Sequence, residues 1–245
     1  MLRTIAFYTK FAISLVTTMP LTKRLEKKVE EFDANNQIIE KYKYMHVESS
    51  KWAEPFIKLS GAKVTVFGAE NLPPDIPVLF VSNHQSNFDI PLLMYYIDKP
   101  KGFIAKKELK KVPMINRWMT MMGCIFMDRS NLRKSAAAII AGIKMLKSGQ
   151  SLVICPEGTR SKGGPMANFK AGSFKLATKS KVPIVPITLN GSYKIMDGVD
   201  NKGKIKPAQV ELYIHKPIYT KDLTKEEELA LPKLVQDIVA SKLSE

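Results

Sequence analysis

The chain contains few of the side chains on which disulfide and metal chemistry depend. Its 245 residues include two cysteines, Cys124 and Cys155, and three histidines, His46, His84 and His215. The cysteines lack C-x-x-C spacing, so neither a disulfide framework nor a structural zinc site is expected, and a reducing cytosolic setting is the default. The histidines are scattered without metal-ligand spacing, so we expect no catalytic metal.

The N-terminal region lacks a hydrophobic run long enough to cross a bilayer. Its longest uncharged run, residues 11–22, is too short and contains Pro20, and no A-x-A cleavage site of a signal peptide follows. On a helical wheel the polar residues gather on one side, and they are Arg3, Thr4, Lys10, Ser14, Thr17 and Thr18. Apolar residues cover much of the rest, a pattern typical of a helix lying in a membrane interface. The alternative is a helix packed on the protein's own core.

Acidic residues are in the minority. The chain has 38 Lys and Arg against 23 Asp and Glu, a formal net charge of +15 and a pI of about 9.6. This balance favours anionic partners: nucleic acid, an anionic membrane surface, a phosphorylated substrate or an acidic protein. The aromatic and basic interleaving of a nucleic-acid module is not visible, so no nucleic acid is expected.

The order of elements predicts an α/β fold with a mixed, largely parallel sheet flanked by helices and an N-terminal membrane-associating helical element. We place the boundary at Gly61, giving a helical region over 1–60 and an α/β domain over 61–245. Trp52, Phe56 and Leu59 recur at helical spacing and could be core or an aromatic edge at headgroup level. Strands are predicted at 63–68, 77–83, 101–106, 123–129, 151–158, 183–191 and 209–215. Helices are predicted at 90–97, 107–122 with an interruption near Pro113, 131–149, 169–180 and 224–243.

Chemically capable side chains follow three of these strands. In such sheets ligands bind at the carboxyl ends of the strands. His84 follows the second strand, and Asp128 and Arg129 follow the fourth. The strand ending near Cys155 is followed by Glu157, Gly158, Thr159 and Arg160. The sequence therefore predicts a site at this edge of the sheet.

The stretch VSNHQSNFDIP (81–91) holds His84 and, five residues later, Asp89. Residues five apart do not share a helix face, but the turn formers Ser86 and Asn87 lie between them. Asp89 could therefore cap the following helix and still face His84. A carboxylate on one imidazole nitrogen leaves the other as a base, and an unperturbed histidine titrates at about 6.5. The alternative is a loop histidine next to a helix cap.

The loop PEGTRSKGG (156–164) combines a carboxylate, glycines and basic residues. Arg160 offers a planar, charged fork suited to phosphate, and Gly158 lets backbone N–H groups approach an anion. Glu157 could accept a hydrogen bond from a substrate hydroxyl or hold Arg160. Most of the six lysines between residues 99 and 111 are interpreted as a solvated face, but Lys106 at a strand end could reach the same cleft. For Arg129, an ion pair with Asp128 is the competing interpretation.

Covalent catalysis is not favoured. The chain has no G-x-S-x-G nucleophile elbow, and Cys155 stands at a strand end where a packing role fits better than a reactive thiolate. A base that activates a substrate hydroxyl is the simplest use of His84 and Asp89.

Together these residues resemble the 1-acyl-sn-glycerol-3-phosphate acyltransferase family. Four ordered blocks carry the resemblance: NHQSNFD (83–89), GCIFMDR (123–129), PEGTRS (156–161) and VPIVPI (182–187). FIAKKEL (103–109) and FKAGSF (169–174) are also similar to family segments, and the likeness runs from about residue 61 to 215. The chain departs from the family at Cys155, where an aromatic residue is usual.

The resemblance implies transfer of a fatty acyl group from acyl-CoA or acyl-ACP (acyl carrier protein) to the sn-2 hydroxyl of lysophosphatidic acid, without a cofactor or an acyl-enzyme. His84 would be the base and Asp89 would orient it. Substrate-binding residues would be Lys106, Arg129, Glu157, Gly158, Thr159 and Arg160. The resemblance also implies a peripheral or monotopic protein on the cytoplasmic face of the cell membrane. The alternatives are another acceptor, such as glycerol 3-phosphate or another lysolipid, and a non-catalytic basic membrane-binding protein.

Overall fold

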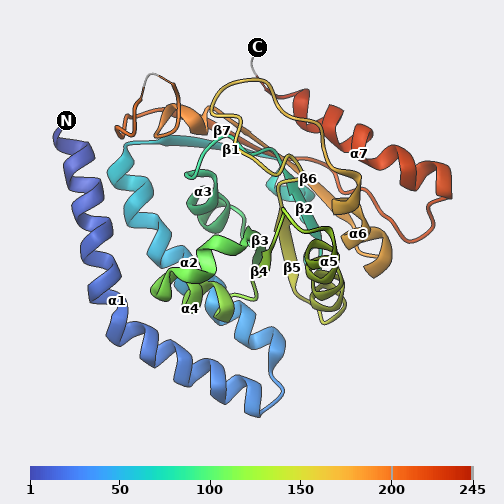
Figure 1. Cartoon of the computed structure of the whole chain (residues 1–245), viewed down its shortest axis with the longest axis horizontal. Coiled ribbons are helices and arrows are strands. Elements are labelled where there is room, and N and C mark those ends of the chain that lie inside the picture. The colour runs from blue at the N-terminus through green and yellow to red at the C-terminus, as the bar shows by residue number, and fades with distance from the viewer. Residues whose placement is uncertain (200, 244–245) are drawn as a thin grey trace.

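A seven-stranded sheet runs through the computed structural model, which describes residues 1–199 and 201–243 (Figure 1). Its strand order is β1-β7-β6-β2-β5-β3-β4, and every neighbouring pair is parallel except β6 and β7. The strands are β1 (Lys63–Phe67), β2 (Leu79–Ser82), β3 (Lys101–Lys106), β4 (Ile125–Met127), β5 (Ser151–Ile154), β6 (Ile184–Asn190) and β7 (Gln209–Ile214). The predicted α/β class with a mixed, largely parallel sheet is confirmed.

Both faces of the sheet are buried, which explains why the sequences of its central strands are continuous apolar runs. Successive side chains of a strand point to opposite faces. In and beside β2, Val78 and Phe80 join one apolar cluster, and Leu79 and Val81 join the other. The first cluster lies against α1 to α4 and the second against α5 to α7.

The helices largely follow the predicted segments. They are α1 (Leu2–Ala34), α2 (Ile38–Ser60), α3 (Asp89–Tyr96), α4 (Pro113–Met121), α5 (Leu132–Lys147), α6 (Lys175–Ser180) and α7 (Lys225–Ala240). The Asn131 side chain caps α5 by accepting from the Lys134 N–H at 2.9 Å, and a capping box opens α7 at Thr224. Residues 107–111 form a separate 3-10 turn, and α4 starts at Pro113, where the missing N–H costs no helical hydrogen bond.

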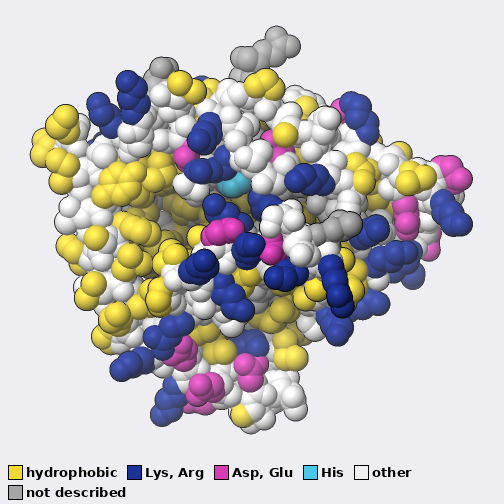
Figure 2. Space-filling view, viewed as in Figure 1, with side chains coloured by type: hydrophobic (Ala, Val, Ile, Leu, Met, Phe, Trp, Pro, Cys, Tyr) yellow, Lys and Arg dark blue, Asp and Glu magenta, His cyan; other side chains and the backbone are white. Residues whose placement is uncertain are grey.

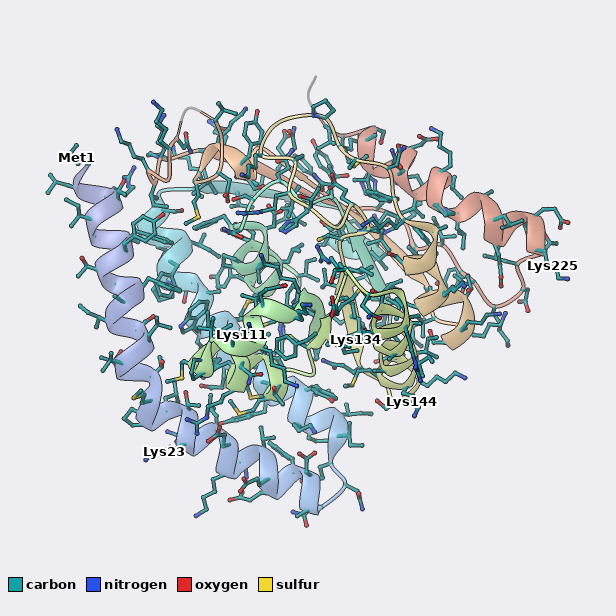
Figure 3. The ribbon with its side chains drawn as sticks, in the orientation of Figure 1. Met1, Lys23, Lys111, Lys134, Lys144 and Lys225 are labelled. Atoms are coloured by element: carbon teal, nitrogen blue, oxygen red, sulfur yellow. The ribbon has the colours of Figure 1, made fainter. Side chains whose placement is uncertain are left out.

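Helices α1 and α2 pack against each other and against the sheet domain (Figure 1). The Phe7 ring lies 5.7 Å from the Phe56 ring, and the Phe11 ring lies 6.4 Å from the Trp52 ring. Phe56 therefore belongs to the core, and Trp52 is partly buried against it. Helix α1 bends near Pro20, and Figure 3 labels Met1 and Lys23 on either side of the bend. Among the described residues, no helix is both long enough and apolar enough to cross a membrane.

Four of the six lysines between residues 99 and 111 are exposed, as predicted for most of them, whereas Lys99 and Lys101 are buried. The Lys99 ammonium group donates to the carbonyls of Pro73 at 2.7 Å and Pro74 at 2.8 Å. The Lys101 ammonium group donates to the carbonyls of Ile97 at 2.7 Å and Lys99 at 3.1 Å, both just after the end of α3. Backbone carbonyls thus satisfy both ammonium groups, which a sequence pattern does not reveal.

Candidate active site

The carboxyl ends of five strands meet at one edge of the sheet, because β6, β2, β5, β3 and β4 are mutually parallel neighbours. The predicted site residues lie in the loops that follow these strands, except Lys106, the last residue of β3, and Asp89, the first residue of α3. Figure 2 shows a histidine side chain near the centre of one face, surrounded by Lys and Arg side chains. This edge is where open α/β sheets bind their ligands.

His84 and Asp89 are hydrogen-bonded. His84 Nδ1 lies 2.7 Å from Asp89 Oδ2, and the Asp89 side chain is fully buried whereas that of His84 is 17% exposed. The Asp89 carboxylate therefore binds the inner nitrogen and orients the ring, leaving the other ring nitrogen available to act on a substrate.

The loop before α3 is wrapped around the Asp89 carboxylate. Asp89 Oδ2 also accepts from the backbone N–H groups of Gln85 at 2.8 Å and Ser86 at 3.0 Å. Asp89 Oδ1 accepts from the Ser192 hydroxyl at 2.5 Å. Asp89 is the first residue of α3, whose N-cap is Phe88, so its side chain faces back into the loop and does not cap the helix.

The Glu157 carboxylate accepts hydrogen bonds from the backbone of two loops. Its Oε1 accepts from the His84 N–H at 2.6 Å, and its Oε2 accepts from the Ala167 N–H at 2.9 Å. The residue is only 4% exposed, and burial raises the pKa of its carboxyl. The carboxylate does not hold Arg160, one of the two roles considered for it, but joins the loop after β5 to the loop after β2.

Arg160 pairs with an aspartate outside the four sequence blocks. Its Nη1 donates to Asp197 Oδ1 at 2.7 Å.

Arg129 and Asp128 have separate partners. Arg129 donates to the Gly158 carbonyl, and Asp128 pairs with Lys107 at 2.8 Å. The Arg129–Asp128 ion pair considered from the sequence is therefore not formed. The Lys107 hydrogen bond lowers the pKa of Asp128 to about 2.

The remaining predicted residues line the same edge. Lys106 is exposed at the end of β3, where it is in register with Met127 of β4, two residues before Arg129. Thr159 is exposed. Gly158 has φ 74°, a backbone conformation that residues with a side chain rarely adopt, so the turn favours glycine.

Sequence reasoning missed Ser192, Gln85 and Asp197. Ser192 binds Asp89, and Gln85 Oε1 accepts from the Gly191 N–H at 3.0 Å. Both contacts join the end of β6 to the loop after β2, its neighbour in the sheet. The only available signal was the polar triplet Asn190-Gly191-Ser192 at the end of a buried strand.

The two cysteines are packing residues. Burial raises the pKa of the Cys124 thiol to about 12, and burial likewise raises the pKa of the Cys155 thiol. Neither is therefore a thiolate near neutral pH. Within residues 1–199 and 201–243, no cluster of three or more His, Cys, Asp or Glu side chains could hold a metal ion.

Comparison with known proteins finds one protein family and many relatives. The family model described as "Acyltransferase" matches residues 63–190, more than half of the chain. A 1-acyl-sn-glycerol-3-phosphate acyltransferase of Borreliella burgdorferi is 34% identical over 187 residues, covering 76% of this chain and 73% of the relative. A chloroplastic 1-acyl-sn-glycerol-3-phosphate acyltransferase, BAT2 of Brassica napus, is 39% identical over 182 residues, covering 72% of this chain and 51% of the relative.

A solved structure shares the fold over nearly the whole chain. The crystal structure of the 1-acyl-sn-glycerophosphate (LPA) acyltransferase PlsC from Thermotoga maritima superposes with a TM-score of 0.79 at 30% identity. The match covers 98% of this chain and 92% of that one. It therefore includes α1 and α2 as well as the sheet domain.

Proposed function

This chain belongs to the 1-acyl-sn-glycerol-3-phosphate acyltransferase family, and we propose that it transfers a fatty acyl group from an acyl thioester to the sn-2 hydroxyl of lysophosphatidic acid. The product is phosphatidic acid, and the donor is acyl-CoA or acyl-ACP. The observation that carries the proposal is the 2.7 Å contact between His84 Nδ1 and the buried Asp89 carboxylate at the end of β2.

In the proposed reaction, His84 is a general base. Its second ring nitrogen, Nε2, takes the proton of the acceptor hydroxyl as that oxygen attacks the thioester carbonyl carbon. Asp89 stabilises the imidazolium that forms. The tetrahedral intermediate then collapses, the C–S bond breaks, and the imidazolium returns the proton to the leaving thiolate. A new ester and a thiol result, and no acyl-enzyme forms.

The acceptor phosphate is proposed to bind the basic side chains around the loop after β5. Arg160 is its main ligand, assisted by Lys106 and Arg129. The positive φ of Gly158 forms the turn that precedes Arg160. Both carboxylate oxygens of Glu157 already accept backbone N–H groups. We therefore assign Glu157 to holding this loop against His84 rather than to accepting a hydrogen bond from a substrate hydroxyl.

We also propose that α1 holds the protein on an anionic membrane surface, on its cytoplasmic side, as a peripheral or monotopic protein. Leu2, Ile5, Ile13 and Val16 share one face of α1 and are exposed, whereas Phe7 on the other side is buried. The hydroxyls of Ser14, Thr17 and Thr18 donate to carbonyls of their own helix. Figure 2 shows apolar side chains gathered over this side of the molecule. An outward apolar face on a basic protein fits an anionic bilayer surface.

Product analysis by mass spectrometry tests the proposed reaction. Wild type and His84→Ala would receive palmitoyl-CoA or palmitoyl-ACP together with lysophosphatidic acid, other lysophospholipids and glycerol 3-phosphate. We expect diacyl product from lysophosphatidic acid, at a rate at least about a hundredfold lower in the variant because the base is lost. The matched control is His46→Ala, since His46 pairs with Asp98 just after the C-terminal end of α3 and outside the candidate site.

Each other outcome changes the conclusion in a defined way. Product from glycerol 3-phosphate or another lysolipid would keep the mechanism and change the acceptor. Full activity of His84→Ala would remove the general-base mechanism. No product from any pair of substrates, with folded wild-type protein, would favour a non-catalytic membrane-binding protein.

A further inference from the structure

The Asp197 carboxylate accepts hydrogen bonds from three donors of the candidate active site. Its Oδ1 accepts from Arg160 Nη1 at 2.7 Å. Its Oδ2 accepts from the Ser86 hydroxyl at 2.7 Å and from the Asn87 N–H at 2.8 Å. Ser86 is fully buried, and the Asp197 side chain is only 12% exposed. Two loops thus direct a guanidinium, a hydroxyl and a backbone N–H at one anionic group.

This donor set is one that binds phosphate as well as carboxylate. Guanidinium groups, hydroxyls and backbone N–H groups are the usual ligands of phosphate oxygens. The anion that occupies the position in this structure is a side chain of the protein itself. A phosphate group presents the same kind of acceptor oxygens with a larger negative charge, so it can compete for all three donors.

The three donors are fixed in position relative to His84. Ser86 and Asn87 lie between His84 and Asp89 in the chain. The Ser161 N–H donates to the His84 carbonyl at 2.8 Å, which attaches the loop carrying Arg160 to the same turn. In lysophosphatidic acid the reactive hydroxyl and the phosphate ester are on adjacent carbons, so an acceptor whose hydroxyl meets His84 must place its phosphate nearby.

We propose that Asp197 is a built-in competitor for the phosphate subsite proposed above: its carboxylate occupies Arg160, the Ser86 hydroxyl and the Asn87 N–H until the acceptor phosphate displaces it. This inference rests on the proposed function. Rotation of the Asp197 side chain vacates the subsite without movement of the loop backbone. An acceptor without a phosphate does not displace the carboxylate, so Asp197 should affect the KM only of acceptors that carry a phosphate.

Chemical labelling of Arg160 tests the subsite without turnover. Phenylglyoxal modification of wild type and Asp197→Asn, quantified for each arginine by peptide mass spectrometry, would be followed with increasing inorganic phosphate. We expect Arg160 to react about two- to fivefold faster in the variant, the range of one partly exposed ion pair. Phosphate should protect Arg160 in both proteins, at a lower concentration in the variant. Arg117, which pairs with Glu26 of α1, is the internal control and should not respond.

Lysophosphatidic acid would then replace inorganic phosphate as the protecting anion. Protection at a lower concentration than inorganic phosphate assigns the subsite to the acceptor. Equal protection would assign it to phosphate ions and overturn that part of the proposal. Unchanged Arg160 reactivity in Asp197→Asn, or weaker protection in the variant, would overturn the displacement itself.

Steady-state kinetics provides the second test. Asp197→Asn should lower the KM for lysophosphatidic acid about two- to fivefold and leave that for monoacylglycerol unchanged. A higher KM for lysophosphatidic acid would instead make Asp197 a residue that positions Arg160. Asp197→Ala replaces the Asn variant if that variant does not fold. If wild type transfers no acyl group to any acceptor, the proposed function fails, whereas the labelling result still decides whether the anion subsite exists.

Discussion

Asp89 is held by more than its contact with His84. Its two carboxylate oxygens accept from the His84 ring, two backbone N–H groups and the Ser192 hydroxyl. The backbone donors keep the carboxylate beside the loop, and Ser192 holds its second oxygen from the neighbouring strand β6. Since the imidazole takes its orientation from this carboxylate, Ser192 is a positioning residue for the proposed base.

Ser192→Ala should therefore lower kcat more than it changes the acceptor KM. We expect kcat to fall about tenfold, because a hydrogen bond to a charged group contributes roughly 1.5–3 kcal/mol and part of it orients the base. Ser192→Thr, which keeps the hydroxyl, should restore most of the rate. Ser50→Ala is the control, since its hydroxyl bonds the Met94 carbonyl outside the site. An unchanged kcat in Ser192→Ala would show that the backbone donors suffice.

At the scale of elements, the turn between α3 and β3 is stabilised by a buried lysine. The Lys101 ammonium group donates to the carbonyls of Met94, Ile97 and Lys99, where the last turn of α3 leaves carbonyls without helical partners. Burial lowers the pKa of this ammonium group to about 7, partly opposed by the negative charge of Asp98. The folded chain therefore gives up this proton at a lower pH than the unfolded chain does.

This shift makes stability depend on pH in a direction that can be tested. Between pH 7 and the ordinary lysine value near 10.4, the unfolded chain holds a proton that the folded chain lacks. The free energy of unfolding should therefore gain up to about 1.4 kcal/mol per pH unit from Lys101 as pH rises through this window.

Denaturant titrations of wild type and Lys101→Met between pH 7 and 10 would measure that contribution. The stability difference between the two proteins should shift in favour of wild type with rising pH. Lys179→Met, at an exposed position of α6, controls for the loss of one lysine. Parallel curves for wild type and Lys101→Met would show that Lys101 keeps its proton in the folded chain.

At the scale of the whole molecule, one face of α1 is the proposed membrane contact, and the opposite face contacts the core and residues that follow Asp197 in the chain. Its outer face carries the exposed apolar side chains, and its inner face packs on the core. Tyr8 donates to the Gly203 carbonyl at 2.9 Å, and Thr4 Oγ1 accepts from the Ile205 N–H at 3.0 Å. These contacts hold the segment that also carries Asp197. The proposed membrane contact and the phosphate subsite are thus joined through one helix.

Two charges on the outer face of α1 should detach the protein from membranes. Ile13→Glu with Val16→Glu removes two exposed apolar side chains and adds negative charge, so affinity for vesicles containing anionic lipid should fall at least about tenfold. Sedimentation with vesicles would measure it, and circular dichroism would check the fold. The matched control is Leu229→Glu with Leu234→Glu on α7, which are also exposed. Equal binding by the α1 variant and wild type would exclude this helix as the membrane contact.

The sequence alone determined the strands and the edge of the sheet at which the candidate site lies. Continuous apolar runs such as residues 77–82 predict strands buried on both faces, and all seven predicted strands form. His84, Asp89, Glu157 and Arg160 follow strands, and parallel strands bring their carboxyl ends to one edge. The roles of these residues, the domain boundary at Gly61 and the absence of a cofactor stay predictions.

Only the tertiary structure decided which side chains form hydrogen bonds with one another at the carboxyl-end edge of the sheet. Ser192 reaches Asp89 across 103 residues because β6 pairs with β2, and Asp197 reaches Arg160 across 37 residues. The burial of Lys101 likewise depends on where α3 ends. Periodicity and spacing reflect contacts within one element, whereas partners of polar groups depend on which loops the strand order places side by side. The strand order in the sheet is set by packing of the whole chain, so it cannot be predicted from any local sequence pattern.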